Sequence, residues 1–359
     1  MTVPRVSRRD MLRLGVTAAV AACARVPPSR ALGTPATLDV RERRLANLRR
    51  LTSGGQNAEA YWDFTGTRLI FQSTRPPYGC DQMFTMAADG SDVRLVSSGT
   101  GRQTCGFFFP DGRRIIYAST HLGGAACPPP PDRSQGYAWP LYPTWEIFSA
   151  DADGGHVRRL TDNDAYDAEG AVSPDGRRIV FTSLRDGDLD LYLMDADGGH
   201  VRRLSDTLGY DGGPFFSWDG RFIVFRASRP ESKDEVEEYR TLLRQNLVRP
   251  RSLDIYYMKA DGTAVSRITR LSGANFAPFM HPNGRQVIFA SNQHDASGRS
   301  FALYLVNLDG SGLERVTWAE GFASFPMFTR DGKRLVFCSS REGAAPRDLN
   351  VFVADWDDR

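Results

Sequence analysis

The most regular pattern along the chain is a short apolar run that follows a turn containing glycine. Ile179–Ser183 follows one such turn, and Leu335–Ser339 follows another. Glycine supplies the positive φ that a tight hairpin turn requires, so each unit predicts a pair of antiparallel strands. Six turns of this kind recur along the chain, at Gly66, Gly112, Gly176, Gly220, Gly284 and Gly332.

Each unit continues with a third apolar run, a second Asp-Gly turn and a short fourth run. Leu191–Met194 is one third run, and the turn at 197–198 follows it. The ten residues 151–160 recur letter for letter at 195–204. Four short strands per copy of about 45 residues are typical of a propeller blade. The sequence therefore predicts an all-β fold, a six-bladed β-propeller.

The two ends of the repeat region supply complementary fragments. The sixth copy reaches Trp356–Arg359, where its fourth strand should begin. A strand without a partner, Leu48–Thr52, precedes the first copy. We expect this N-terminal strand to complete the last blade, because closure removes two exposed sheet edges. The predicted propeller spans residues 43–359.

The repeat motifs resemble those of a known family. Pro-Asp-Gly-Arg-Arg-Ile at 174–179 and Asp-Ala-Asp-Gly at 151–154 are similar to the WD40-like, or PD40, repeats of the TolB propeller. TolB carries an N-terminal α/β domain, for which the residues before Leu45 leave no room. The resemblance therefore implies an exported, stand-alone TolB-like propeller whose partner is an envelope protein or peptide, or a glycan.

Residues 1–30 indicate an export signal and linker. Arg8 and Arg9 precede an apolar run at 14–24 that is too short to span a bilayer. The run resembles a twin-arginine signal, and an ordinary secretory signal is the alternative. Residues 20–23 form a lipobox that would place a lipid on Cys23, whereas Ala22–Ala24 also fits a cleavage site. We expect a periplasmic or cell-envelope protein that touches the membrane only through this signal or a lipid.

Charge excludes one class of partner. The whole chain carries +2, and four arginines against one aspartate give residues 1–22 a charge of +3, which leaves −1 for residues 23–359. A near-neutral propeller lacks the basic surface that nucleic acid requires. We expect no nucleic-acid partner, and we expect a monomer.

Two copies carry insertions. The spacings between successive turn glycines are 46, 64, 44, 64 and 48 residues, so blades 2 and 4 are extended, at residues 121–144 and 229–253. Both insertions separate strands two and three of their blade, which places them on one face. Elaborated loops on one face of a rigid scaffold favour a binding site, and neutral loop drift is the alternative.

The two insertions differ in character. The first contains His121, Tyr137 and Trp139 around a proline run, which suits a stiff wall for a peptide or sugar. The second begins with acidic residues and places apolar residues at helical spacing on one face, so it predicts a short amphipathic helix that is either a lid or a packed decoration. The residues on that face are Val236, Tyr239 and Leu243.

The start of each innermost strand is rich in polar residues. Nine residues before each turn glycine stand Asn57, Gln103, Asp167, Asp211, Asn275 and Ala323. Two residues further on stand Glu59, Cys105, Glu169, Gly213, Ala277 and Phe325. Period-two alternation puts both sets on one side of their strands, which we assign to the central channel. A water-filled channel with a polar lining is the alternative to a binding site.

We therefore predict a ligand site at the channel mouth and rim. Its residues are Asn57, Glu59, Gln103, Asp167, Glu169, Asp211, Asn275, His121, Tyr137 and Trp139. The converging carboxylates of Asp167, Glu169 and Asp211 would suit a hard cation, so Ca²⁺ is the cofactor that this mouth would favour.

Catalytic motifs are missing from the sequence. It has five histidines, no zinc-binding helix motif, no Gly-x-Ser-x-Gly elbow and no glycine-rich phosphate loop. The pattern favours a non-catalytic propeller that binds a protein segment or glycan at the inserted face. The alternative is a carbohydrate-active or other hydrolytic enzyme that uses the mouth carboxylates and a cation.

The cysteines suit an oxidising compartment. Cys80, Cys105 and Cys127 all map to the rim with the insertions. We predict a disulfide between Cys105 and Cys127, with Cys80–Cys105 as the alternative. Cys338 lies within an apolar strand, and we expect it to be an unpaired core residue.

Overall fold

The computed structural model describes residues 33–132, 134 and 136–359. The predicted export signal and the lipid site at Cys23 lie outside these residues. In the described part of the chain, no helix is long and apolar enough to cross a membrane.

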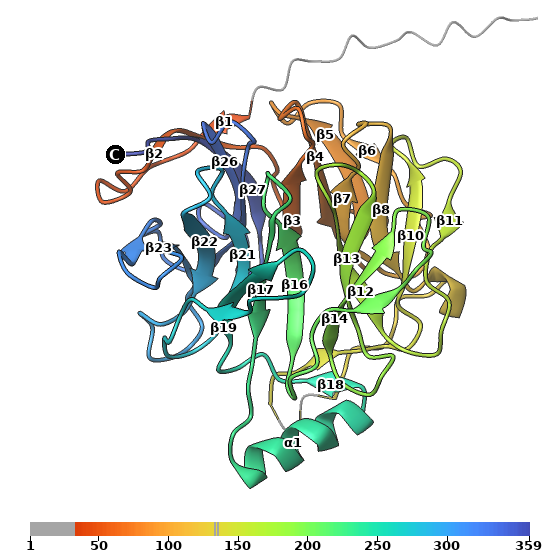
Figure 1. The fold of residues 1–359 in the computed structure, drawn as a ribbon. Coiled ribbons are helices and arrows are strands. Elements are labelled where there is room, and N and C mark those ends of the chain that lie inside the picture. Colours follow the sequence, from red (N-terminus) through yellow and green to blue (C-terminus); the bar gives the residue numbers. More distant parts are fainter. Residues whose placement is uncertain (1–32, 133, 135) are drawn as a thin grey trace, which may run out of the picture. The chain divides into compact units, whose positions relative to one another are not determined.

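Of the seven antiparallel sheets formed by the described residues, six are the predicted blades (Figure 1). Blade 1 contains β3 (Asn57–Trp62), β4 (Arg68–Ser73), β5 (Gln82–Ala87) and β6 (Arg94–Leu95). Blade 2 contains β7 (Gln103–Phe108), β8 (Arg114–Ser119), β10 (Glu146–Asp151) and β11 (Arg158–Arg159). Blade 3 contains β12 (Asp167–Val172), β13 (Arg178–Ser183), β14 (Asp190–Asp195) and β15 (Arg202–Arg203).

The second half of the ring repeats this order. Blade 4 contains β16 (Asp211–Phe216), β17 (Phe222–Ala227), β19 (Asp254–Lys259) and β20 (Ser266–Arg267). Blade 5 contains β21 (Asn275–Met280), β22 (Gln286–Ser291), β23 (Ala302–Asn307) and β24 (Glu314–Arg315). Blade 6 contains β25 (Ala323–Phe328), β26 (Arg334–Ser339), β27 (Asn350–Trp356), β2 (Leu45–Arg50) and β1 (Thr34–Pro35). The first strand of each blade contacts the first strands of both neighbours, including β3 with β25, so the ring is closed.

Closure follows the sequence prediction. Strand β2 pairs antiparallel with β27, so residues from the beginning of the propeller complete the last blade. Strand β1 then adds a fifth strand to the same sheet, which the sequence did not predict. The Ala36 amide extends this pairing by donating to the Leu48 carbonyl at 2.9 Å.

The apolar runs form the core between blades. The six predicted turn glycines all have positive φ, between 63° and 72°. The second strand of every blade buries one aromatic ring completely, and each of these rings packs against an aromatic ring of the third strand of its own blade, within one continuous core. Burial of such rings is the main favourable term for a ring of short strands. They are Phe71, Tyr117, Phe181, Phe225, Phe289 and Phe337.

The two insertions lie on one face, as predicted, and they also join each other. Strand β9 (Trp139–Pro140) of the first insertion pairs antiparallel with β18 (Leu247–Val248) of the second. We call these paired residues the strap. The short 3-10 helix η1 (His121–Gly123) opens the first insertion. In Figure 1, β18 and helix α1 (Lys233–Arg244) lie together at the bottom of the view.

Helix α1 confirms the predicted amphipathic segment. Ser232 and Glu235 form a capping box at its start, which satisfies backbone donors that the first turn leaves free. The buried face consists of Tyr239, Leu242 and Leu243, so Leu242 takes the place that the sequence assigned to Val236. The Tyr239 hydroxyl donates to the Asp188 carboxylate of blade 3 at 2.5 Å, which fixes the helix to the neighbouring blade.

Each innermost strand carries a bulge that the sequence did not predict. The pairing register with strand two shifts near the third residue of all six strands. At that position φ lies between 49° and 59° in every blade, although only one of the six residues is glycine. A bulge inserts an extra residue and interrupts the alternation of side chains. The bulge residues are Glu59, Cys105, Glu169, Gly213, Ala277 and Phe325.

The disulfide prediction is wrong. Cys80 is bonded to Cys127, with the two Cα atoms 5.9 Å apart, whereas Cys105 is free. Cys105 is a bulge residue, so its side chain turns toward the propeller axis and away from the insertion. The bond that does form ties the first insertion to blade 1. Cys338 is buried and free, as predicted.

Candidate functional site

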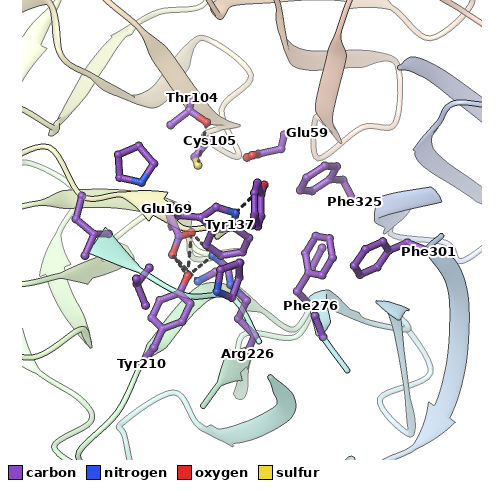
Figure 2. Close-up of a pocket in the computed structure, with 18 of the residues that line it drawn as sticks. Glu59, Thr104, Cys105, Tyr137, Glu169, Tyr210, Arg226, Phe276, Phe301 and Phe325 are labelled. Atoms are coloured by element: carbon purple, nitrogen blue, oxygen red, sulfur yellow. Dashed lines mark hydrogen bonds and ion pairs between the residues drawn. The ribbon is translucent and has the colours of Figure 1, made fainter. Parts of the chain in front are cut away.

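A cavity of about 640 Å³ lies at the axis of the propeller beneath the strap. All six bulge residues line it, one from each blade. The prediction that this set faces the channel is therefore confirmed. Figure 2 shows Glu59 between Cys105 and Phe325, with Glu169, Tyr210 and Arg226 on the other side of the cavity.

Aromatic rings close the floor of the cavity. The centroids of Tyr61 and Phe215 are 5.0 Å apart, and Phe215 also contacts Phe107 at 6.0 Å and Phe279 at 5.7 Å. These rings pack edge to face or tilted, which is the favourable geometry for aromatic pairs. The channel is thus plugged below the bulges, and the space above it is a cavity with a bottom.

The strap forms the roof. Tyr137 and Trp139, both predicted from the sequence, line the cavity together with Val248 of the other insertion. The Trp139 indole nitrogen donates to the Tyr137 hydroxyl at 3.1 Å. The Trp139 ring also packs edge-on against Tyr210, with centroids 6.3 Å apart. The first insertion therefore reaches from blade 2 across to the residues of blade 4.

One side of the cavity holds a buried ion pair. Glu169 accepts hydrogen bonds from the Thr182 hydroxyl and the Gly213 amide, both at 2.8 Å, and it pairs with Arg226. Arg226 also donates to the Tyr210 hydroxyl. Burial works against the charge of Arg226, yet the neighbouring Glu169 carboxylate is strong enough to raise its pKa. Arg226 is therefore a fixed positive charge.

Two aromatic rings contact this arginine, and a glycine leaves the space that it occupies. The Arg226 guanidinium carbon lies 5.1 Å from the Trp139 ring centroid and 5.2 Å from that of Tyr210, which is cation–π distance. A Cβ at Gly213 would lie 2.0 Å from Arg226 Nη1. Glycine at this bulge is therefore required by the arginine as well as by its φ of 57°.

Glu59 differs from Glu169 in having no basic partner. Among the described residues, no arginine, lysine or histidine forms an ion pair with it. Burial raises the pKa of Glu59 to about 7, and the nearby Glu169 charge acts in the same direction, whereas a hydrogen bond with Cys105 opposes it. Glu59 is thus a carboxyl group that both gains and loses its proton near neutral pH.

The remaining polar groups of the wall are largely paired. Arg102 lies 3.5 Å from the Asp81 carboxylate, and the Thr104 hydroxyl donates to Gln72 at 2.6 Å. Asn292 accepts from the Ala274 amide at 2.8 Å and donates to a backbone carbonyl at 3.0 Å. Several polar groups of the lining are thus held by partners within the protein.

The side of the cavity formed by blades 5 and 6 is aromatic. Phe276 lies 5.2 Å from Phe301 and 6.0 Å from Phe325, measured between ring centroids. Phe301 and Phe322 are 5.4 Å apart, and both are only half-buried. This apolar wall faces the carboxyl groups across the cavity (Figure 2).

The other predicted set of polar residues does not face the channel. Because the bulge interrupts the alternation, this set points into the blades, where its members are at most 1% exposed. Asn57 bonds to Ser73 and to backbone carbonyls, and the Asn275 amide donates to the Leu253 carbonyl at 2.7 Å. The residues removed from the site by this finding are Asn57, Gln103, Asp167, Asp211 and Asn275.

The predicted metal site is also wrong. Asp167 pairs with Arg185 at 3.0 Å, Asp211 pairs with Arg229 at 2.5 Å, and Glu169 has its own arginine. Each carboxylate is neutralised separately, so the three do not converge. In the part of the chain that the structure describes, no group of three histidine, cysteine, aspartate or glutamate side chains could hold a metal. The residues do not fit the predicted Ca²⁺.

Comparison with known proteins identifies the propeller type. Residues 143–248 match the family model of the TolB beta propeller domain. The chain is a six-bladed propeller whose fold is similar to that of the TolB propeller. A protein described as TolB from Agrobacterium tumefaciens is 20% identical, with a TM-score of 0.57, over 84% of this chain and 91% of that one.

Two further structures extend the comparison. TolB from Acinetobacter baumannii is 17% identical, with a TM-score of 0.57, over 83% of this chain and 65% of that one. A gluconolactonase from Xanthomonas campestris is 16% identical, also with a TM-score of 0.57, over 92% of this chain and 98% of that one. Identities this low establish a shared fold and leave the ligand or reaction open.

His121 occupies a structural position in this TolB-like repeat. The second residue after strand two is an arginine in four blades, namely Arg75, Arg185, Arg229 and Arg341, and His121 stands there in blade 2. Its Nδ1 is 2.6 Å from the Ser119 hydroxyl, and its ring centroid is 4.5 Å from that of Phe148. His121 packs on its own blade and does not line the cavity, so its assignment to the site is wrong.

Sequence reasoning missed several residues of the site, including Tyr210, Arg226 and the phenylalanine wall. Arg226 could have been recognised from its position in the sequence. It stands inside the apolar strand Phe222–Ala227, at a position where four other blades have Ala118, Thr182, Ala290 and Cys338. A charge at a buried strand position needs a partner, and the partner is the Glu169 carboxylate of the preceding blade.

Proposed function

We propose that this TolB-like propeller is a non-catalytic binding module that takes the end of an extended peptide segment into the cavity beneath the strap. The observation that carries the proposal is the enclosure itself. A floor of packed rings, a wall of one bulge residue per blade and a roof from both insertions surround about 640 Å³. This volume is in the range of ligand cavities, and the roof admits a chain end more readily than a folded surface.

The lining supports a peptide over a glycan. A glycan would bring many hydroxyl groups, and each needs a hydrogen-bonding partner when it is buried. Several polar groups of the wall already have partners: Glu169 pairs with Arg226, Arg102 lies 3.5 Å from Asp81, and Thr104 bonds to Gln72 behind the wall. Rings such as Phe276 and Phe301 instead offer apolar contact to a peptide side chain.

The disulfide supports export as part of this proposal. A bond between Cys80 and Cys127 persists in oxidising compartments and is rare in the cytosol. We therefore propose that the chain works in the periplasm or cell envelope as a monomer. Export by the twin-arginine route and a lipid on Cys23 belong to the same proposal.

Binding can be tested by the effect of ligands on thermal unfolding. Short peptides and oligosaccharides are added to the mature protein and to Trp139→Ala, which opens the roof, with Val265→Ala on the outer rim as control. We expect peptides to raise the melting temperature of the protein and the control by the same amount, and that of Trp139→Ala much less. Stabilisation by oligosaccharides alone, or equal stabilisation of all three proteins, would count against the proposal.

A second candidate function rests on Glu59. A carboxyl group with a pKa of about 7 beside a second glutamate has the properties of a general acid–base catalyst. The chain would then hydrolyse a glycoside or lactone in this cavity. Turnover of such substrates that is lost in Glu59→Gln, while the melting temperature holds, would favour this alternative.

A further inference from the structure

The cavity contains two glutamates with opposite surroundings. Glu169 is matched by the guanidinium of Arg226, which is itself held between the rings of Trp139 and Tyr210. Glu59 lines the same cavity from blade 1, next to Cys105 of blade 2. It forms no ion pair with a cationic side chain among the described residues. The protein supplies the positive charge for one carboxylate and leaves the other open to the cavity.

The rest of the lining cannot neutralise Glu59. Arg226 is committed to Glu169 and Tyr210, and Arg102 lies against Asp81. Arg251, the third arginine of the lining, pairs with Glu238 of helix α1. The charged and titratable groups near Glu59 are therefore Arg226, which is already paired with Glu169, the acids Glu169 and Asp81, each with its own arginine, and the thiol of Cys105.

Aromatic rings border the space in front of Glu59. Phe325 is the bulge residue of the adjacent blade 6, and Phe276 lies 6.0 Å from it. Tyr61 lies below, two residues along the same strand, and lines the cavity. Aromatic faces around a carboxylate attract organic cations through the ring quadrupole, as the site of Arg226 illustrates within this molecule.

From this geometry we infer that the cavity selects a compact organic cation, an alkylammonium or guanidinium group carried on an apolar body, with Glu59 as its counter-ion and Phe276 and Phe325 as its walls. The inference rests on the proposed binding function and specifies which chain end binds. A lysine or arginine side chain, or a peptide amino terminus next to an apolar residue, has this chemistry. A glycan or a carboxylate end does not.

Binding of a cation should be coupled to the proton of Glu59. Because the group is partly protonated near neutral pH, a cation that requires the ionised form displaces that proton. Affinity should therefore rise about tenfold per pH unit below the Glu59 pKa and level off above it. Glu169 and Asp81 are each paired with an arginine, so Glu59 is the carboxyl group of the cavity with which a bound cation would pair.

Three probes of one shape test the charge preference by titration calorimetry. They are 4-phenylbutylamine, which is a cation from pH 5.5 to 8.5, the neutral 4-phenylbutan-1-ol and the anion 4-phenylbutyrate. We expect the amine to bind about tenfold or more tightly than the alcohol, and the anion least. Measurements in buffers of different ionisation enthalpy should show proton release with the amine alone.

Variants separate this inference from the proposed function. In Glu59→Gln the advantage of the amine over the alcohol should disappear together with its pH dependence. Glu59→Asp should keep the preference, and Glu231→Gln on the exposed start of the second insertion is the matched control. Melting temperatures report whether each variant folds.

The outcomes lead to different conclusions. Equal binding of amine and alcohol to the unmodified protein would overturn the charge preference and leave the binding function standing. A preference for the amine that survives in Glu59→Gln would overturn the role of Glu59. Failure of all three probes and of peptides to bind would overturn the binding function as well.

Discussion

Trp139 of the blade 2 insertion pairs with Val248 of the blade 4 insertion across a two-stranded sheet. Neither blade could cover the cavity alone, because each insertion supplies one strand of the roof. The Leu141 amide extends this pairing by donating to the Asn246 carbonyl at 2.7 Å. The strap is therefore a shared element whose stability depends on both loops.

Disruption of the strap should open the cavity without unfolding the propeller. Val248 is 1% exposed, so Val248→Asp would bury a charge with no partner and separate the two strands. We expect hydrogen exchange to speed up at the Leu141 amide, which donates to the Asn246 carbonyl in the strap, and to stay slow in the blade strands. Val265→Asp, at an exposed site of the outer rim, is the control. Faster exchange throughout blades 2 and 4 would contradict a local role for the strap.

The disulfide should stabilise the first insertion against blade 1. Its two cysteines are 47 residues apart, and the loop-closure model predicts that loss of the bond lowers the free energy of unfolding by about 2–4 kcal/mol. The double variant Cys80→Ala/Cys127→Ala should therefore melt at lower temperature than the unmodified protein, and reductant should have no further effect on it.

Cys105→Ala provides the control for this experiment. Cys105 is free, so this variant should keep its sensitivity to reductant. Loss of that sensitivity in Cys105→Ala would instead support one of the pairings predicted from the sequence.

The ion pair of Glu169 and Arg226 should be strongly coupled. Arg226→Met leaves a buried carboxylate without its partner, and we expect the free energy of unfolding to fall by about 3–5 kcal/mol. The double variant Arg226→Met/Glu169→Gln removes both charges and should recover much of this loss. Urea denaturation of the two single variants and the double variant measures the coupling. Additive effects would mean that the pair contributes nothing beyond its separate side chains.

Glu59 should make the folded state less stable as the pH rises. Its pKa is about 7 in the folded protein against the ordinary 4.5, so the folded state holds the proton more tightly. Stability from this group is complete below pH 4.5 and is lost between pH 4.5 and about 7. Glu59→Gln cannot ionise, so it should be more stable than the unmodified protein at pH 8, by an amount on the order of 2 kcal/mol.

Chemical denaturation at pH 5 and pH 8 checks this prediction. The difference between Glu59→Gln and the unmodified protein should be small at pH 5 and large at pH 8. Glu231→Gln should show no such difference. A constant difference at both pH values would mean that Glu59 titrates near its ordinary range.

The sequence was sufficient to predict the ring of blades, but it was not sufficient to predict which residues line the cavity. Turn glycines and apolar runs have local causes, so six blades, closure by Leu48–Thr52 and the helix of the second insertion could all be predicted. Which side chains of the innermost strands face the channel could not be predicted, because five of the six bulges place a residue other than glycine at positive φ. Nothing in Glu59 or Phe325 as residue types signals such a backbone.

The misplaced polar residues could have been recognised by their partners. Asp167 and Asp211 each pair with an arginine two residues after strand two of the same blade, Arg185 and Arg229. The recurrence of arginine at that repeat position was visible in the sequence, and it marks a structural pair. The strap could not be predicted, because nothing local in residues 139–140 or 247–248 specifies that two loops separated by a whole blade meet.

Because of the bulges, the residues that stabilise the ring of blades differ from the residues that face the cavity. Residues that point into the blades hold the ring, while a single residue per blade, raised at the bulge, faces the cavity. Replacing Glu59, Cys105, Ala277 or Phe325 changes the inner surface at one blade and keeps the pairing of the strands, whereas Glu169 and Gly213 are tied to Arg226. Descendants of such a scaffold can therefore acquire new selectivity by single substitutions at four of the six blades.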